Sequence, residues 1–70
     1  MQKVKSSIIY KVGYENGNLI VQFTSLSMYK YFKVPKRTYT YFLKAKSKGR
    51  YFLKYVKYTY EFIFLGMGGK

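Results

Sequence analysis

The feature that most constrains the fold is a series of short runs in which apolar and polar residues alternate, joined by turns of a few residues. The runs cover residues 7–14, 19–24 and 28–34, and they are rich in β-branched and aromatic side chains. Such alternation is typical of strands with one buried face. Connections this short cannot form a parallel crossover, which needs about a dozen residues or more. The sequence therefore predicts an antiparallel meander of three strands.

The first turn and the inward faces follow from the same pattern. Asn16-Gly17 predicts a two-residue hairpin turn, because both residues tolerate a positive φ. In the second run, Leu19, Val21 and Phe23 are expected to point inward. In the first run, alternation places four side chains on one face, namely Ile8, Tyr10, Val12 and Tyr14.

The spacing changes from strand to helix after Pro35. This proline ends the third strand and suits the first helical position, where its missing N–H costs nothing. Tyr39, Phe42 and Leu43 then recur at i, i+3 and i+4, which predicts a helix. Residues 47–49 break this pattern and supply a serine as the candidate N-cap of a second helix.

A fourth run, over residues 59–65, returns to the strand pattern and has large apolar groups on both faces. An unpaired apolar edge would aggregate, so we expect this strand to join the sheet beside the meander. Phe62 and Phe64 are expected to lie against the helices. Pairing with a second copy of the chain across a two-fold axis, giving a homodimer, remains the alternative.

These elements together predict an α+β fold. It is a small antiparallel β-meander of three strands plus a C-terminal strand, packed against two short helices. We expect a single domain over residues 1–65 and a flexible tail at 66–70. A chain of 70 residues buries only about 60% of the surface that it exposes when unfolded. Its ten Tyr and six Phe are therefore expected to supply much of the core.

The chemistry available to this chain is narrow. It has no Cys and no His, which removes disulfides, Cys/His metal sites, and thiol or imidazole catalysis. Glu15 and Glu61 are its only acids, too few for a carboxylate metal cage. Ser6 and Ser7 lack a general base that would activate them. We expect a non-enzymatic protein without a metal or other cofactor.

Several short motifs, in this order along the chain, resemble the KTSC domain family. They are residues 4–8, Gly13-Tyr14, residues 19–23, Tyr29-Lys30-Tyr31, Val34-Pro35, residues 45–49, Tyr51-Phe52 and Val56-Lys57. The family is a short module that occurs alone in bacteria and phages and at the C-terminus of some lysyl-tRNA synthetases. The resemblance covers residues 4–60 and implies RNA binding, which has been proposed for the family without an assigned activity. The segment after Tyr60 runs past the usual end of the domain.

Ten of the 14 basic residues lie between Asn16 and Tyr60, a stretch that contains no acid. Unpaired like charges destabilise a compact state, so we expect a partner to supply the counter-charge, and phosphate fits best. The candidate phosphate contacts are Lys30, Lys33, Lys36, Arg37, Lys44, Lys46, Lys48, Arg50, Lys54 and Lys57. A basic surface that merely keeps the protein soluble is the alternative.

Tyr29 and Tyr31 flank Lys30 in the third run and share one face of the predicted strand. If that face is open, both rings can stack on unpaired bases. If it meets the helices, both rings belong to the core. Alternation alone does not choose between the two arrangements.

Two functions from different classes fit these observations. The first is a nucleic-acid-binding module for RNA or another single strand, in which lysines neutralise the backbone and tyrosines stack on bases. The alternative is a small protein-interaction module, such as a phage-encoded inhibitor, that docks on an acidic protein surface. The sequence shows no signal peptide and no apolar run long enough to span a membrane, so we expect a cytoplasmic protein without a membrane partner.

Overall fold

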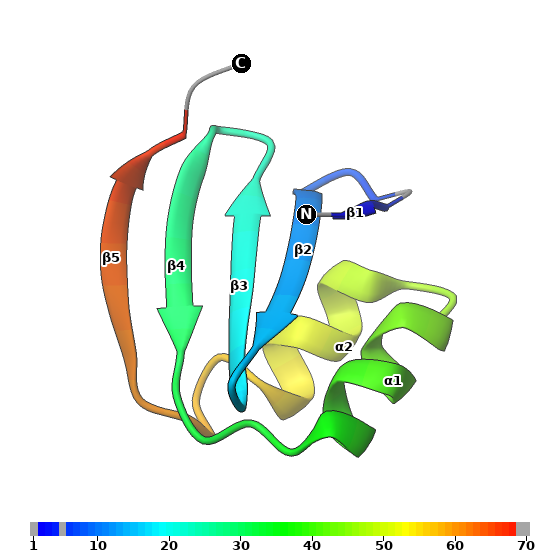
Figure 1. Ribbon diagram of the computed structural model, residues 1–70. Coiled ribbons are helices and arrows are strands. Elements are labelled where there is room, and N and C mark those ends of the chain that lie inside the picture. The colour runs from blue at the N-terminus through cyan, green and yellow to red at the C-terminus, as the bar shows by residue number, and fades with distance from the viewer. Residues whose placement is uncertain (1, 5, 69–70) are drawn as a thin grey trace.

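The computed structural model describes residues 2–4 and 6–68, which form a five-stranded sheet with two helices on one side (Figure 1). The helices are α1 (Lys36–Lys44) and α2 (Lys48–Tyr55). The strands are β1 (Gln2–Lys3), β2 (Ile9–Glu15), β3 (Asn18–Phe23), β4 (Ser27–Tyr31) and β5 (Phe62–Met67). The predicted α+β class is confirmed, and β1 is an additional short strand.

The strands lie in the order β1-β2-β3-β4-β5, and each pairs antiparallel with its neighbours. The prediction that the C-terminal strand joins the sheet is confirmed, because Phe62 pairs with Tyr31 and Phe64 with Tyr29. The strand continues through Gly66 to Met67, so the predicted tail at 66–70 begins too early. The last two residues of that predicted tail lie outside the described part of the chain.

The local signals at the first turn and at α2 act as predicted. Asn16 and Gly17 have φ values of 51° and 79°, and Glu15 pairs directly with Asn18, as a two-residue hairpin requires. Ser47 is the N-cap of α2, and its Oγ accepts a hydrogen bond from the Arg50 N–H at 3.4 Å. Residues within the turn and at the start of the helix are therefore sufficient to explain these two features.

The predicted faces of β2 are wrong in its first half. The register against β3 shifts between Ile9 and Lys11, which is a β-bulge, and both Ile9 and Val12 are fully buried. Because a bulge sets two residues against one on the partner strand, it reverses the alternation on one side. Ile8 is therefore 39% exposed, whereas Tyr14 still points inward and donates a hydrogen bond to the Val34 carbonyl at 2.7 Å.

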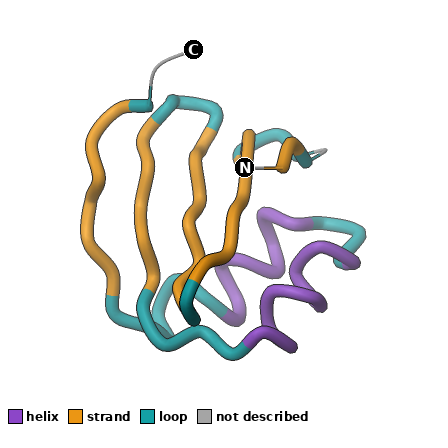
Figure 2. Tube along the Cα trace, viewed as in Figure 1, coloured by secondary structure: helices purple, strands orange, loops and turns teal. Residues whose placement is uncertain are grey.

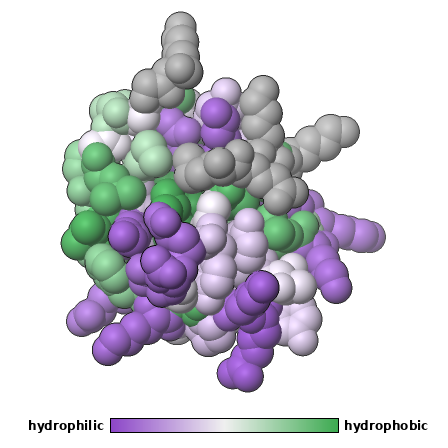
Figure 3. All heavy atoms as spheres, viewed as in Figure 1, coloured by the Kyte–Doolittle hydropathy of each residue, from purple (hydrophilic) through white to green (hydrophobic). Residues whose placement is uncertain are grey.

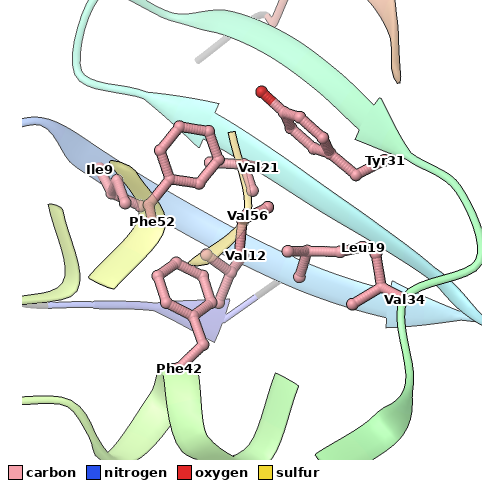
Figure 4. Packing of buried hydrophobic residues seen from close by; sticks show 9 residues of the cluster. All are labelled: Ile9, Val12, Leu19, Val21, Tyr31, Val34, Phe42, Phe52 and Val56. Carbon is pink, nitrogen blue, oxygen red and sulfur yellow. The ribbon is translucent and has the colours of Figure 1, made fainter. Parts of the chain in front are cut away.

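The core lies between the helices and the inner face of β2, β3 and β4, the face toward the helices (Figure 4). Phe42 reaches it from α1, as predicted from the apolar spacing of that helix, and Phe52 reaches it from α2. The buried apolar residues are Ile9, Val12, Leu19, Val21, Tyr31, Val34, Phe42, Phe52 and Val56. Within residues 2–4 and 6–68, no helix is long and apolar enough to cross a bilayer.

The helices cover only part of the sheet. They lie behind and beside β2 and β3, and no helix lies behind β5 (Figures 1 and 2). Phe62 and Phe64 point to the inner side of the sheet, yet they remain 51% and 56% exposed. The prediction that these two rings pack against the helices is wrong, because helices of nine and eight residues stop short of β5.

Candidate functional site

Most of the predicted phosphate contacts gather on the two helices and the segments that flank them. Seven of these side chains are exposed, and we call this set the cationic helix surface: Lys36, Arg37, Lys44, Lys46, Arg50, Lys54 and Lys57. Lys48 belongs to the same layer but is half-buried, and its Nζ donates to the Ala45 carbonyl at 3.0 Å. No acid occurs between residues 36 and 57, so the charge of this layer is uncompensated within it.

Lys30 and Lys33 lie apart from the cationic helix surface. Lys30 pairs with Ile20 and Ile63 on the outer face of the sheet, opposite the helices, because its neighbours in β4 point inward. Lys33 is exposed in the turn after β4, with a φ of 57°. The structure therefore brings together eight of the ten predicted contacts and separates these two.

Tyr29 and Tyr31 face the helices, which is the second of the two arrangements that alternation left open. Tyr31 is only 3% exposed, and its ring lies 5.4 Å from the Phe52 ring. Burial, with a smaller contribution from the charge of a neighbouring Tyr29 phenolate, raises the pKa of Tyr31 to about 12. Tyr31 thus belongs to the core, whereas Tyr29 is half-buried at its edge.

An open hollow of about 490 Å³ lies between α2 and the inner face of β4 and β5. We call it the aromatic hollow, after the six rings that line it: Phe23, Tyr29, Tyr31, Phe52, Tyr58 and Phe62. Lys57 also lines it, and none of the described residues along it is acidic. Sequence reasoning missed this feature, although a C-terminal strand with apolar groups on both faces was a signal that one face lacks cover.

A second hollow of about 410 Å³ adjoins the first along α2. We call it the basic hollow, because Lys46, Lys48 and Arg50 line it and none of its described lining residues is acidic. Ile8 and Leu53 line both hollows, so the two lie side by side. One hollow is lined by cations and the other mainly by aromatic rings.

Gly49 allows α2 to approach Ile8 at the junction of the hollows. It is buried in the first turn of the helix, and a Cβ built on it would lie 2.8 Å from Ile8 Cδ1. The predicted break at residues 47–49 is therefore shorter than expected, since α2 already begins at Lys48. The small residue brings the basic end of the helix close to the start of β2.

The outer face of the sheet also differs from one part to another. Hydrophobic side chains gather at the β5 side, whereas hydrophilic side chains project from the lower edge and around the helices (Figure 3). Tyr58, in the segment between α2 and β5, is 83% exposed, and Lys57 Nζ lies 5.2 Å from the centre of its ring. An exposed ring beside a cation can present an apolar plane to a ligand without first giving up a packed position.

Comparison with known proteins finds the same kind of domain. The sequence model of the KTSC domain matches residues 5–60. The crystal structure of a KTSC domain protein from Yersinia pestis is 37% identical and superposes with a TM-score of 0.90, covering 93% of this chain and 94% of that one. Comparison with curated protein sequences finds no match. The sequence of residues 5–60 and the fold of nearly the whole chain are therefore both similar to those of KTSC domains.

Proposed function

The chain belongs to the KTSC domain family, and we propose that it is a cytoplasmic, non-enzymatic module that binds RNA or another single-stranded nucleic acid. The observation that carries the proposal is the cationic helix surface. Its seven exposed cations share one layer of a small domain, and the chain offers no acid between residues 36 and 57. A polyanion would supply the missing counter-charge.

The physical basis is the release of counterions from the nucleic-acid backbone. Each phosphate that a lysine or arginine neutralises frees condensed cations, which makes the affinity strong at low salt and steeply salt-dependent. Only Arg37 and Arg50 among the 14 basic residues have the forked geometry that suits bidentate reading of bases. The proposed contacts therefore hold the backbone and do not read a defined sequence.

The test is the affinity for a short oligouridylate over a series of salt concentrations, with single- and double-stranded DNA alongside. In the triple variant Lys46→Gln, Arg50→Gln and Lys54→Gln, the slope of log affinity against log salt should flatten by about 0.7 per lost contact. The matched control is Lys11→Gln, Lys30→Gln and Lys33→Gln, which removes the same charge away from the helices. A slope that is unchanged in the first variant, or equally flattened in both, contradicts a binding surface on the helices.

A second candidate function has one observation in its favour. β5 lies at the edge of the sheet, its six residues carry no charge, and Ile63 and Leu65 are exposed. An extended segment of an acidic partner protein would add to this edge as a further strand. Absence of oligonucleotide binding at low salt would favour this function, and a second copy of the chain at the edge would be detected by sedimentation.

A further inference from the structure

We propose that the aromatic hollow is a binding site for one unpaired nucleobase, with Lys57 and the cations of the basic hollow holding the neighbouring phosphates. This inference rests on the proposed function and assigns it a place, because it names where the bases of a bound strand lie. The chemical class of the ligand is a single-stranded nucleotide segment. RNA and single-stranded DNA both present that chemistry.

The size and lining of the hollow suit a flat aromatic ligand. Its volume of about 490 Å³ lies within the range of about 300–1,000 Å³ typical of small-molecule sites. The hydroxyls of Ser25 and Ser27 line the same hollow, 3.2 Å apart, and can hydrogen-bond to the edge of a base. An aromatic surface with a few polar groups is the usual composition of such a site.

Rings that line the hollow pack against one another edge to face. Tyr29 meets Phe23 and Phe62 at interplanar angles of 75° and 65°, with centroid distances of 5.7 and 5.6 Å. Stacked pairs lie on the α1 side of the molecule instead, where Tyr14 and Tyr39 are 5.0 Å apart at an angle of 16°. The open ring surface in the hollow belongs to Tyr58 and Phe62, which are 83% and 51% exposed. Stacking on such exposed rings tolerates every base.

The charges around the hollow favour a nucleotide over an apolar peptide. Lys57 lines the aromatic hollow, and Lys46 and Arg50 line the basic hollow beside it. Each base of a strand lies next to a phosphate, so a ring-lined pocket beside a cationic one matches that arrangement of groups. A peptide with an aromatic side chain would fill the first hollow and leave the cations of the second without a partner.

The first experiment uses the unmodified protein and two strands of equal length. One is an oligouridylate, and the other keeps the sugar–phosphate backbone but lacks bases; an oligothymidylate distinguishes RNA from DNA as the source. We expect the strand with bases to bind about fivefold more tightly or better, the effect of one stacked base. Equal affinity for both strands overturns this inference and leaves the proposed function standing, whereas no binding of either strand overturns both.

The second experiment places the base by mutation. Tyr58→Ala and Phe62→Ala should each weaken the binding of oligouridylate by about fivefold, and the binding of the abasic strand should not change. The matched controls are Tyr41→Ala, which removes a 59% exposed ring from α1, and Ile63→Ala, which shortens a side chain on the outer face of β5. Circular dichroism confirms folding, and Tyr58, at 83% exposure, can be removed without disturbing the core.

A fluorescent base gives an independent readout of the same contact. A single 2-aminopurine in the oligouridylate should lose fluorescence on binding, since stacking on a ring quenches it. The loss should shrink with Phe62→Ala and persist with Ile63→Ala. If all four variants bind and quench alike, the bases lie elsewhere and the inference is wrong.

Discussion

The two halves of the sheet both carry apolar side chains on the inner face, but these side chains are buried in one half and exposed in the other. In the half that the helices cover, Val12, Leu19 and Val21 are fully buried. In the uncovered half, Phe62 and Phe64 occupy equivalent inward positions on β5 and remain more than half exposed. β4 marks the boundary between the halves.

Side-chain chemistry does not explain this difference, because the larger apolar groups are the exposed ones. The explanation is the reach of the helices. Strands lie about 4.8 Å apart, so a fifth strand widens the sheet beyond the area that α1 and α2 cover. The core stabilises the domain from the covered half, while the uncovered half keeps aromatic surface available to a ligand.

The largest effect is expected from removing β5 by truncation after Tyr60. β4 would become the edge of the sheet, and the buried ring of Tyr31 would lose Phe62, whose centroid lies 5.4 Å away. A domain of this size has only about 3–5 kcal/mol of stability, so we expect loss of the folded circular dichroism signal. A folded monomer of unchanged association state would show that β5 contributes nothing to the fold. A folded monomer derived from a dimeric parent would place β5 in an interface between copies.

The next largest effect compares one phenylalanine from each half. Phe42→Ala empties a fully buried site between α1 and the sheet and should lower the free energy of unfolding by about 3 kcal/mol or more. Phe64→Ala removes a ring that water already reaches, so a loss of about 1 kcal/mol is expected. Chemical denaturation measures both. Equal losses would contradict the division of the sheet into covered and uncovered halves.

Features that depend on a few neighbouring residues were predictable from the sequence. Asn16-Gly17 forms the hairpin and Ser47 caps α2, because each acts on backbone within three residues. The bulge near Tyr10 was not predictable, since it depends on how β2 pairs with β3. Alternation showed that Tyr29 and Tyr31 share a face but gave no indication of which face the helices cover.

The candidate site divides in the same way. The grouping of cations from Lys36 to Lys57 follows from the helices that carry them, whereas the separation of Lys30 follows from its position between two inward tyrosines. The aromatic hollow exists because α2 does not extend across the inner face of β5. Such a relation between distant segments leaves no trace in local spacing, and its only sequence signal was a strand that is apolar on both faces.

A smaller effect is expected on raising the pH, and it tests how deeply Tyr31 is buried. Burial raises the pKa of Tyr31 to about 12, whereas a tyrosine in the unfolded chain ionises near pH 10. The folded state therefore retains a proton that the unfolded state releases, so stability is complete below pH 10 and falls between pH 10 and 12. Tyr31→Phe should reduce this fall. Tyr39 and Tyr51, whose pKa values burial also raises, should account for what remains, and a fall of undiminished steepness contradicts the prediction.

The smallest effect concerns the charge that the covering helices carry. Lys36 and Arg50 lie in the first turns of α1 and α2, where the partial positive charge of the helix end repels a cation. Lys44 and Lys54 lie in the last turns, where the helix end attracts one.

These positions offer two variants that remove the same charge from the covered half. Lys36→Gln with Arg50→Gln should raise the free energy of unfolding by about 0.5 kcal/mol, because it relieves both the repulsion at the helix ends and that among the cations. Lys44→Gln with Lys54→Gln relieves only the second repulsion and loses a favourable contact, so it should gain nothing or lose about 0.5 kcal/mol. Urea denaturation at low salt measures the difference, which should shrink in 1 M NaCl as the charges are screened. Equal shifts in the two variants would mean that net charge alone limits the stability of the covered half, whichever helix ends carry it.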